Sequence, residues 1–137
     1  MDCGFIIKQI NDIMEKNANN MLRSQELTMT QAGMLIELDK RKDKTASFKE
    51  LEKIFSVAQS TIVGIVKRLE QKGWVEIIND TQDMRVRYAH LTLTGQEKCK
   101  EGYKHMAEAE KNLTNALTDD EKEKFKKLLN KVRNSIQ

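Results

Sequence analysis

The sequence predicts a mainly α-helical fold with one small β-hairpin. Proline is absent from the 137 residues and glycine occurs only six times, although average usage would supply about seven prolines. Over most of the chain, apolar residues recur every three or four positions, which is typical of amphipathic helices. Between residues 75 and 93 this spacing gives way to short β-favouring stretches. We therefore expect long helices interrupted by one hairpin.

Length and composition indicate one soluble domain rather than a membrane or secreted protein. The longest apolar run, residues 62–66, is far shorter than the ~20 residues of a membrane span. The amino-terminal segment MDCGFIIKQI lacks the regions of a signal peptide, so a cytoplasmic location is expected. Cys3 and Cys99 form no closely spaced pair, which favours a reducing compartment. The formal net charge of +3 permits a polyanionic partner without requiring one.

Four helices are expected before the hairpin. Their predicted ranges are 3–22, 28–42, 47–55 and 58–72. The second ends in the charged turn DKRKDK, and Gly73 takes a helix-ending position after the fourth.

Five Ser/Thr-x-x-Glu/Gln pairs mark candidate helix starts, because each side chain of such a pair can satisfy an unpaired backbone N–H. The pairs are Thr28/Gln31, Ser47/Glu50, Ser56/Gln59, Thr94/Glu97 and Thr118/Glu121. Ala58 stands directly before the fourth helix, so the capping of that helix is assigned to Ser56.

The hairpin is expected from residues 75–79 and 85–93, joined by the polar segment DTQDM. Helical spacing returns after Gly95, and Thr118 opens a last helix. One stripe of the helix after the hairpin consists of Cys99, Tyr103, Met106, Glu110, Leu113 and Leu117. Such a stripe must be buried, either in the core of its own chain or against a second copy.

The fourth predicted helix has two contrasting faces. Its apolar face consists of Ile62, Ile65, Val66 and Leu69. The opposite face is small and polar, with positive charge in its later turns, and suits a DNA major groove. The alternative is an ordinary solvated surface. The predicted DNA contacts of this helix are Gln59, Ser60, Thr61, Val63, Gly64, Lys67 and Arg68.

The hairpin supplies a second set of candidate DNA contacts, Asp83, Arg85 and Arg87. Arg85 and Arg87 alternate on the predicted strand and would point to the same face. Arginine at a hairpin tip can enter a narrow minor groove, where the negative potential is enhanced. Asp83 can orient Arg85 through a charge-assisted hydrogen bond. A solvated surface ion pair is the alternative interpretation.

Residues 54–95 resemble the MarR family of bacterial transcription regulators. The segment STIVGIVKRLEQKG is similar to the recognition helix of that family, with Leu69 and Gly73 at the matching positions. Asp83 and Arg85 match its Asp-x-Arg wing motif. The segment LTLTG that follows matches its Leu-Thr-x-x-Gly motif, and LTMTQ at 27–31 is a weaker match. The resemblance extends over essentially the whole chain.

The resemblance implies a winged helix-turn-helix fold in a single domain, residues 1–137. It implies a DNA-binding part at 28–95 and dimerisation helices at 1–27 and 96–137. A homodimer would hold one pseudo-palindromic site on double-stranded DNA. The family also implies a repressor that is released by a small apolar or phenolic ligand, bound where the first, second and fifth helices meet the winged motif. We expect no cofactor and no metal.

Some features depart from this interpretation or allow others. Gly64 stands where many relatives carry a longer polar or basic side chain, which removes one candidate base contact. Residues 44–97 carry eight basic and seven acidic side chains, so a protein-interaction module without DNA binding is a second hypothesis. Cys3 allows a third, a thiol-based redox sensor. His90 and His105 are isolated, which disfavours a metal site. No catalytic motif is present, so an enzyme is not expected.

Overall fold

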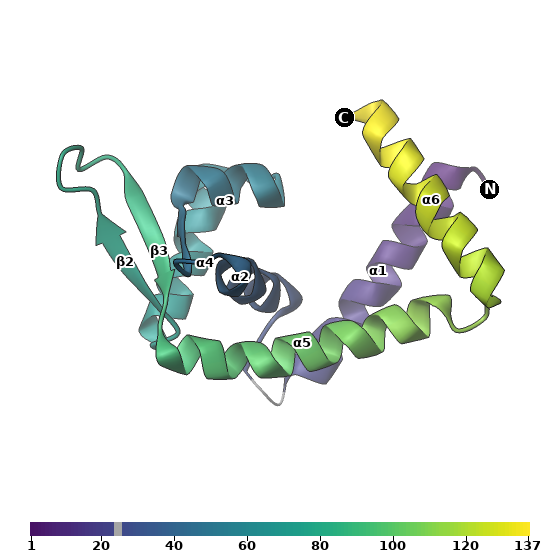
Figure 1. The fold of residues 1–137 in the computed structure, drawn as a ribbon, viewed down its shortest axis with the longest axis horizontal. Coiled ribbons are helices and arrows are strands. Elements are labelled where there is room, and N and C mark those ends of the chain that lie inside the picture. Colours follow the sequence, from purple (N-terminus) through teal and green to yellow (C-terminus); the bar gives the residue numbers. More distant parts are fainter. Residues whose placement is uncertain (24–25) are drawn as a thin grey trace. The chain divides into compact units, whose positions relative to one another are not determined.

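The computed structural model describes residues 1–23 and 26–137. The described elements follow one another as α1 (Cys3–Leu22), α2 (Met29–Lys40), β1 (Thr45–Ser47), α3 (Phe48–Phe55), α4 (Gln59–Gln71), β2 (Val75–Asn79), β3 (Arg87–Leu91), α5 (Leu93–Thr114) and α6 (Asp119–Ile136) (Figure 1). The chain divides into two compact units, Met1–His105 and Met106–Gln137. The predicted mainly helical fold is confirmed.

Three of the five predicted capping pairs are present as reciprocal hydrogen bonds. Thr28, Ser47 and Thr118 each accept a hydrogen bond from the backbone N–H three residues later. The Gln or Glu at that third position accepts one in return from the backbone N–H of the capping residue. Local sequence therefore determines where α2, α3 and α6 begin.

The other two capping predictions were wrong. Ser56 ends α3 in a left-handed conformation with φ 51°, and Ala58 precedes α4 without any side-chain cap. Thr94 lies inside α5, because the hydroxyl of Thr92 already accepts the N–H of Gly95 at 3.0 Å. In both places a neighbouring residue, Ala58 before α4 and Thr92 before α5, occupies the capping position that the sequence pattern assigned to Ser56 or Thr94.

The sheet has three strands rather than the two of the predicted hairpin. Strand β1 pairs antiparallel with β3, which lies between β1 and β2. The Thr45 hydroxyl also lies 2.8 Å from Nδ1 of His90 on β3. A strand of three residues is too short to show a periodic pattern in the sequence. Strand β3 begins at Arg87, two residues later than predicted.

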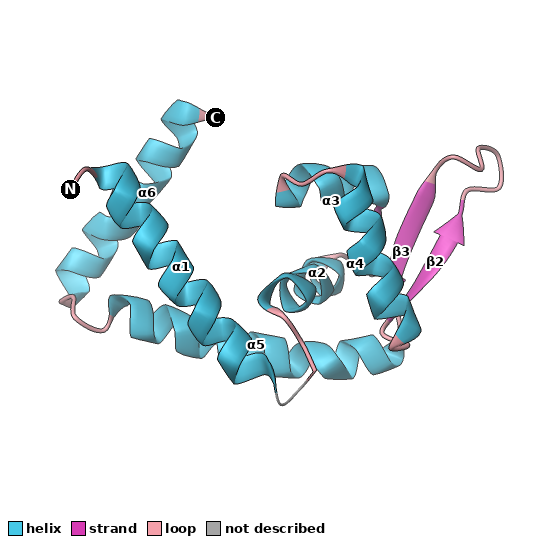
Figure 2. Ribbon diagram, turned by 180° about the vertical axis from the view of Figure 1, so that it is seen from behind, coloured by secondary structure: helices cyan, strands magenta, loops and turns pink. Residues whose placement is uncertain are grey.

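The core of the amino-terminal unit joins α2, α3, α4 and the sheet. Ile62, Val66 and Leu69 of α4 are fully buried, as predicted. They belong to one buried cluster with Leu35 of α2 and Leu51 of α3. The β2–β3 hairpin continues beyond these helices as a projecting ribbon (Figure 2). This core fixes α4 and the base of the hairpin in one body.

The start of α5 is packed closely against the start of the hairpin. A Cβ atom placed on Gly95 would lie 2.0 Å from the carbonyl oxygen of Trp74, so only glycine fits there. The Thr92 hydroxyl donates a hydrogen bond to the carbonyl of Gly73 at 2.7 Å. Gly73 itself has φ 78°, which ends α4 as predicted. The Thr and Gly of the Leu-Thr-x-x-Gly motif therefore hold the base of the hairpin against α5.

The terminal helices leave apolar side chains exposed within one chain. On α1 these are Phe5, Ile6, Ile7 and Ile13, and on α6 they are Leu128, Leu129, Val132 and Ile136. No residue of α6 is buried, and every residue of that helix is described. On the predicted stripe of α5, Cys99 is buried but Tyr103 and Met106 are exposed.

Candidate nucleic-acid interface

The exposed face of α4 carries six of the seven DNA contacts predicted on this helix. They are Gln59, Ser60, Thr61, Gly64, Lys67 and Arg68. Val63 differs from these six, because it is half-buried and packs against the core. A Cβ atom on Gly64 would meet nothing within 4 Å, so the bare backbone at this position is open to an approaching surface.

The positive charges of α4 form no ion pair with the described carboxylates, although Glu70 lies on the same helix. Lys67 and Arg68 are exposed, and neither forms an ion pair with any residue that the structure describes. The amino-terminal end of α4 also lacks a side-chain cap, since Ala58 provides none. The positive end of the helix dipole and the two side-chain cations therefore give this face a positive potential.

The tip of the hairpin is organised by Asp83. Its carboxylate accepts hydrogen bonds from Nε of Arg85 at 3.1 Å, from Nη2 of Arg85 at 3.3 Å and from the Arg85 backbone N–H at 3.0 Å. The predicted charge-assisted bond is thus confirmed, and its guanidinium donors hold the pKa of Asp83 below its usual value. The Arg85 side chain nevertheless remains 91% exposed.

Arg87 occupies a different environment from Arg85. Its guanidinium lies over the ring of Phe48 on α3, 4.8 Å from the ring centroid. Arg85 precedes β3, so the prediction that both arginines alternate on one strand was wrong. The turn that Asp83 stabilises delays the start of the strand. Arg85 is presented at the tip, whereas Arg87 braces the hairpin against α3.

The two cysteines also lie in contrasting environments. Cys3 is exposed and Cys99 is buried. Burial, together with the nearby Asp39 carboxylate, raises the pKa of the Cys99 thiol from its usual 9.0 to about 12. At neutral pH this thiol is protonated and unreactive, as expected for a core residue. A redox role would therefore have to rest on Cys3.

An open depression of about 310 Å³ lies where the end of α1, the start of α2 and the end of α4 meet. It is lined by Asn19, Arg23, Glu26, Leu27, Thr28, Gln31 and Lys72. The effector pocket was predicted where the first, second and fifth helices meet the winged motif. The described lining of this depression includes no α5 residue, and all of its named residues except Leu27 are polar or charged in type.

The described part of the chain holds neither a metal-binding cluster nor a membrane-spanning helix. Residues 1–23 and 26–137 contain no group of three or more His, Cys, Asp or Glu side chains placed to hold a metal ion. In those same ranges, no helix combines the length and the apolar character needed to cross a membrane.

The sequence and the fold of this chain match those of known proteins. Residues 27–86 match the family model described as MarR family. The chain is also 30% identical over 126 residues to the uncharacterized HTH-type transcriptional regulator YwoH of Bacillus subtilis, with 90% of each chain covered. The chain belongs to the MarR family. The resemblance inferred from the sequence is thereby confirmed.

Two further comparisons concern proteins named MarR. The multiple antibiotic resistance protein MarR of Salmonella typhimurium is 28% identical over 130 residues, covering 94% of this chain and 89% of that protein. A mutant of Escherichia coli MarR solved in complex with operator DNA has a TM-score of 0.83 at 28% identity, covering 94% and 91% of the two chains. These relatives are transcription regulators and not enzymes. This MarR-family chain is a transcriptional regulator with a winged helix-turn-helix fold.

Sequence reasoning missed several residues that shape the interface. Thr92 caps α5 and ties it to Gly73, but the competing pair at Thr94 obscured this. Phe48 supports Arg87, a contact between positions 39 residues apart that no local pattern reveals. The hydrogen-bonded turn at the hairpin tip was signalled only by its two aspartates, Asp80 and Asp83.

Proposed function

We propose that this MarR-family regulator acts as a homodimeric repressor on a pseudo-palindromic operator. In this proposal, α4 enters the major groove and the hairpin acts as a wing that reaches the adjacent minor groove. The observation that carries the proposal is the exposed face of α4, which combines small side chains with two cations that form no ion pair among the described residues. The wing tip adds a second cation-bearing element, in which Asp83 orients Arg85.

The chemistry of α4 supports a role in reading bases. Ser60 and Thr61 supply hydroxyl groups and Gln59 an amide, which can pair with base edges in the major groove. Gly64 lets the helix approach closely, because nothing beyond its backbone occupies that part of the face. Lys67 and Arg68 supply phosphate or guanine contacts further along the helix.

The wing supports a role in shape recognition. Arg85 is nearly fully exposed, yet Asp83 limits its conformations, so its side chain is partly organised before DNA binds. An arginine presented in this way suits a narrow minor groove. Arg87 would contribute chiefly by holding the wing against α3.

The dimer is supported by the uncovered apolar faces of α1 and α6. Leu128, Leu129 and Val132 are about half exposed in one chain, which is costly unless another surface covers them. A second copy supplies a matching surface by symmetry. Two copies would also place two α4 helices about 34 Å apart, one DNA turn.

The repressor role follows from occupancy, because a dimer on promoter DNA excludes other proteins from that DNA. We propose that a small apolar or phenolic effector releases the dimer by altering the separation of the two α4 helices. Thermal stabilisation and operator release by phenolic compounds test this. Release by peroxide alone, abolished in Cys3→Ser, would instead favour the redox-sensor hypothesis.

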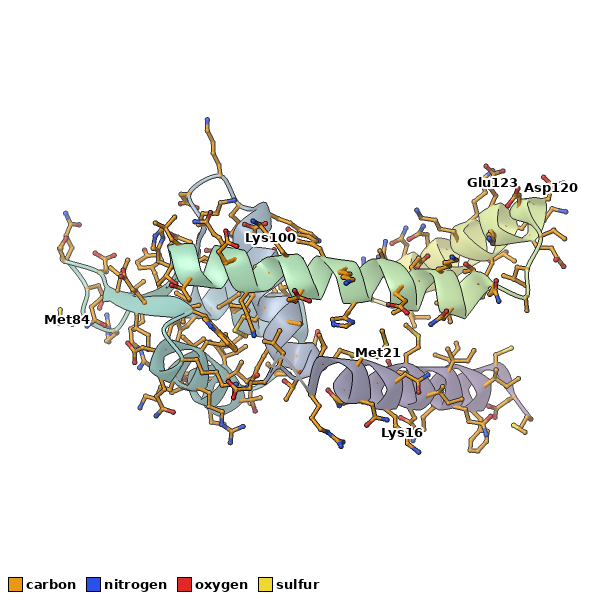
Figure 3. The ribbon with its side chains drawn as sticks, turned by 90° about the horizontal axis from the view of Figure 1, so that it is seen from below. Lys16, Met21, Met84, Lys100, Asp120 and Glu123 are labelled. Atoms are coloured by element: carbon orange, nitrogen blue, oxygen red, sulfur yellow. The ribbon has the colours of Figure 1, made fainter. Side chains whose placement is uncertain are left out.

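Fluorescence anisotropy on the protein's own upstream DNA, measured over a series of salt concentrations, tests the DNA interface. Arg85→Ala should weaken binding to all operator variants and reduce the slope of log K against log[salt] by about one. Lys67→Ala and Ser60→Ala should change preference among operator variants, with a loss of roughly 1–3 kcal/mol wherever a base contact is removed. Lys100→Ala, on α5 (Figure 3), is the control because Lys100 is exposed outside α4 and the wing.

The same measurement separates DNA binding from the rival hypothesis. A protein-interaction module on this fold would show no saturable binding, and the variants in α4 and the wing would all be silent. Intact affinity in Arg85→Ala at physiological salt would remove the wing from the interface. Silence of both classes of variant would overturn the proposed DNA interface as a whole.

A further inference from the structure

The wing tip carries an exposed apolar side chain that the proposed DNA contacts do not use. Met84 is 70% exposed, and it lies between Asp83 and Arg85 at the outermost part of the hairpin (Figure 3). Most large apolar residues elsewhere in residues 28–95 pack into the core, although Leu93 at the start of α5 is 80% exposed. Met84 contributes nothing to that core, so its side chain is free to contact a partner at the tip.

The tip is a structured turn. The backbone N–H of Val86 donates to the carbonyl of Asp83 at 3.0 Å, which places Met84 and Arg85 at the two central positions. The N–H of Asp80 donates to the carbonyl of Val86 at 2.9 Å and closes the loop behind this turn. The Asp83 carboxylate fixes the backbone and side chain of Arg85. One braced turn therefore presents the thioether and the guanidinium together.

The charges of Asp83 and Arg85 at the tip partly cancel, so an apolar contact can contribute to the binding of DNA as well. Asp83 offsets much of the positive charge of Arg85, so Coulombic attraction to DNA is weaker than that of an isolated arginine. Methionine is flexible and polarisable, and proteins that bind the minor groove use such side chains as wedges between base steps. The contribution of Met84 to DNA affinity would not depend on counterion release and would persist at high salt.

We propose that Met84 is an apolar wedge that contacts the minor groove and bends the operator at the wing. This inference rests on the proposed DNA interface and adds a specificity-determining residue to it. Arg85 supplies the electrostatic attraction, and Met84 reads how easily the step beneath it opens. Flexible pyrimidine–purine steps such as TA and CA/TG should be preferred at that point, whereas stiff A-tract steps should be disfavoured.

Three substitutions separate apolar character from size. Met84→Ala removes the side chain, Met84→Gln keeps its length but makes it polar, and Met84→Leu keeps it apolar. Because the position is exposed, all three should leave the thermal unfolding midpoint of the protein nearly unchanged. Met84→Ala and Met84→Gln should each weaken operator binding about tenfold through lost apolar burial. Met84→Leu should stay close to the wild-type affinity.

The decisive experiment measures binding across salt together with DNA bending by circularly permuted gel shift. Met84→Ala should lose affinity without a change in salt slope, and the bend should fall by roughly 20° or more. Arg85→Ala is the matched control, since it should change the salt slope by about one. Replacing the flexible step under the wing by an A-tract step should lower the affinity of the wild-type protein relative to that of Met84→Ala, whose remaining wing contact, Arg85, favours the narrow groove of an A-tract.

The possible failures can be told apart. If Arg85→Ala changes the salt slope while Met84→Ala keeps wild-type affinity and bend, the wedge is wrong and the DNA interface stands. If Met84→Gln binds as tightly as Met84→Leu, the contact is not apolar and the wedge is again wrong. If the wild-type protein binds no operator, the DNA interface fails and the wedge fails with it.

Discussion

Apolar side chains are mostly buried in the winged part of the chain, residues 28–95. On the terminal helices α1 and α6 many of them are exposed. In the winged part, Ile62 and Leu69 are fully buried within one chain. On α6, Leu128 is 59% exposed and Val132 is 50% exposed, although they recur at the same helical spacing. The core of the winged part is therefore completed within one chain, with Leu22 of α1 and Cys99 of α5 contributing to it, whereas the apolar faces of the terminal helices stay uncovered.

The two regions also differ in how their helices are specified. Helix α6 begins with a complete capping box and three acidic residues in its first turn, so it is marked by its local sequence. Helix α4 has no side-chain cap and contains Gly64, so it depends on the core beneath it. The helix proposed to enter DNA therefore draws its stability from packing, which leaves its outer face free for function.

The largest expected effect is on the proposed dimer. Leu128→Asp or Val132→Asp places a carboxylate on the apolar face of α6 and should raise the dimer dissociation constant at least about 100-fold, because a buried unpaired charge is very costly. Lys127→Asp adds the same acidic side chain at an exposed position of α6 outside this apolar set and should have little effect. Sedimentation velocity measures the dimer dissociation constant of these variants and of the wild-type protein. A stable, folded wild-type monomer at micromolar concentration would contradict the interface.

The next effect is on the core of the winged part. Leu69→Ala should lower the free energy of unfolding by about 2–5 kcal/mol, because it leaves a cavity where the side chain is fully buried. Urea denaturation followed by Trp74 fluorescence measures this loss, since Trp74 belongs to the same buried cluster. A loss below about 1 kcal/mol would mean that Leu69 does not pack into a core completed within one chain.

A smaller effect is expected at two glycines. Gly64→Ala should stabilise the free protein by up to about 1 kcal/mol, since helix propensity improves and the new methyl group meets nothing. It should weaken operator binding if α4 approaches DNA closely at this position. Gly95→Ala is the contrasting variant, because its Cβ atom would overlap the Trp74 carbonyl and should destabilise the protein. Equal melting temperatures for the two variants would contradict this pair of predictions.

The smallest effect concerns the cysteines and pH. Alkylation at pH 8 should modify Cys3 rapidly and Cys99 only after unfolding, as mass spectrometry can show. The pKa of Cys99 is raised from 9.0 to about 12, so the folded state holds its proton more strongly than the unfolded state. The stability that this provides is fully present below pH 9 and is lost as the pH rises towards 12. Cys99→Ala should therefore show a weaker fall in stability over that range.

Much of the architecture could be predicted because strong local signals agree with the fold. The capping boxes at Thr28, Ser47 and Thr118, and the glycine that ends α4, fix element boundaries through bonds within a few residues. The faces of α4 follow from helical periodicity alone. Strand β1 could not be predicted in this way, because it exists only through pairing with β3, a partner 43 residues further along in the case of Ala46 and Ala89.

In the candidate site, too, some features follow from local sequence and others depend on contacts between distant residues. The exposed residues of α4 and the Asp83–Arg85 bond follow from local spacing. The different roles of Arg85 and Arg87 do not, since one depends on a turn that delays β3 and the other on a ring of α3. Val63 was expected on the DNA-facing side but packs against the core, because the buried arc of α4 is wider than the pattern indicated.

We propose that the winged part, whose core is completed within one chain, binds DNA only as one half of a dimer. Mass photometry of the wild-type protein on an operator duplex tests it directly, with Leu128→Asp measured alongside. We predict two chains per duplex for the wild-type protein, together with loss of the complex in Leu128→Asp although the winged part remains folded by its Trp74 fluorescence. A single chain bound per duplex with undiminished affinity, in either protein, would contradict the claim.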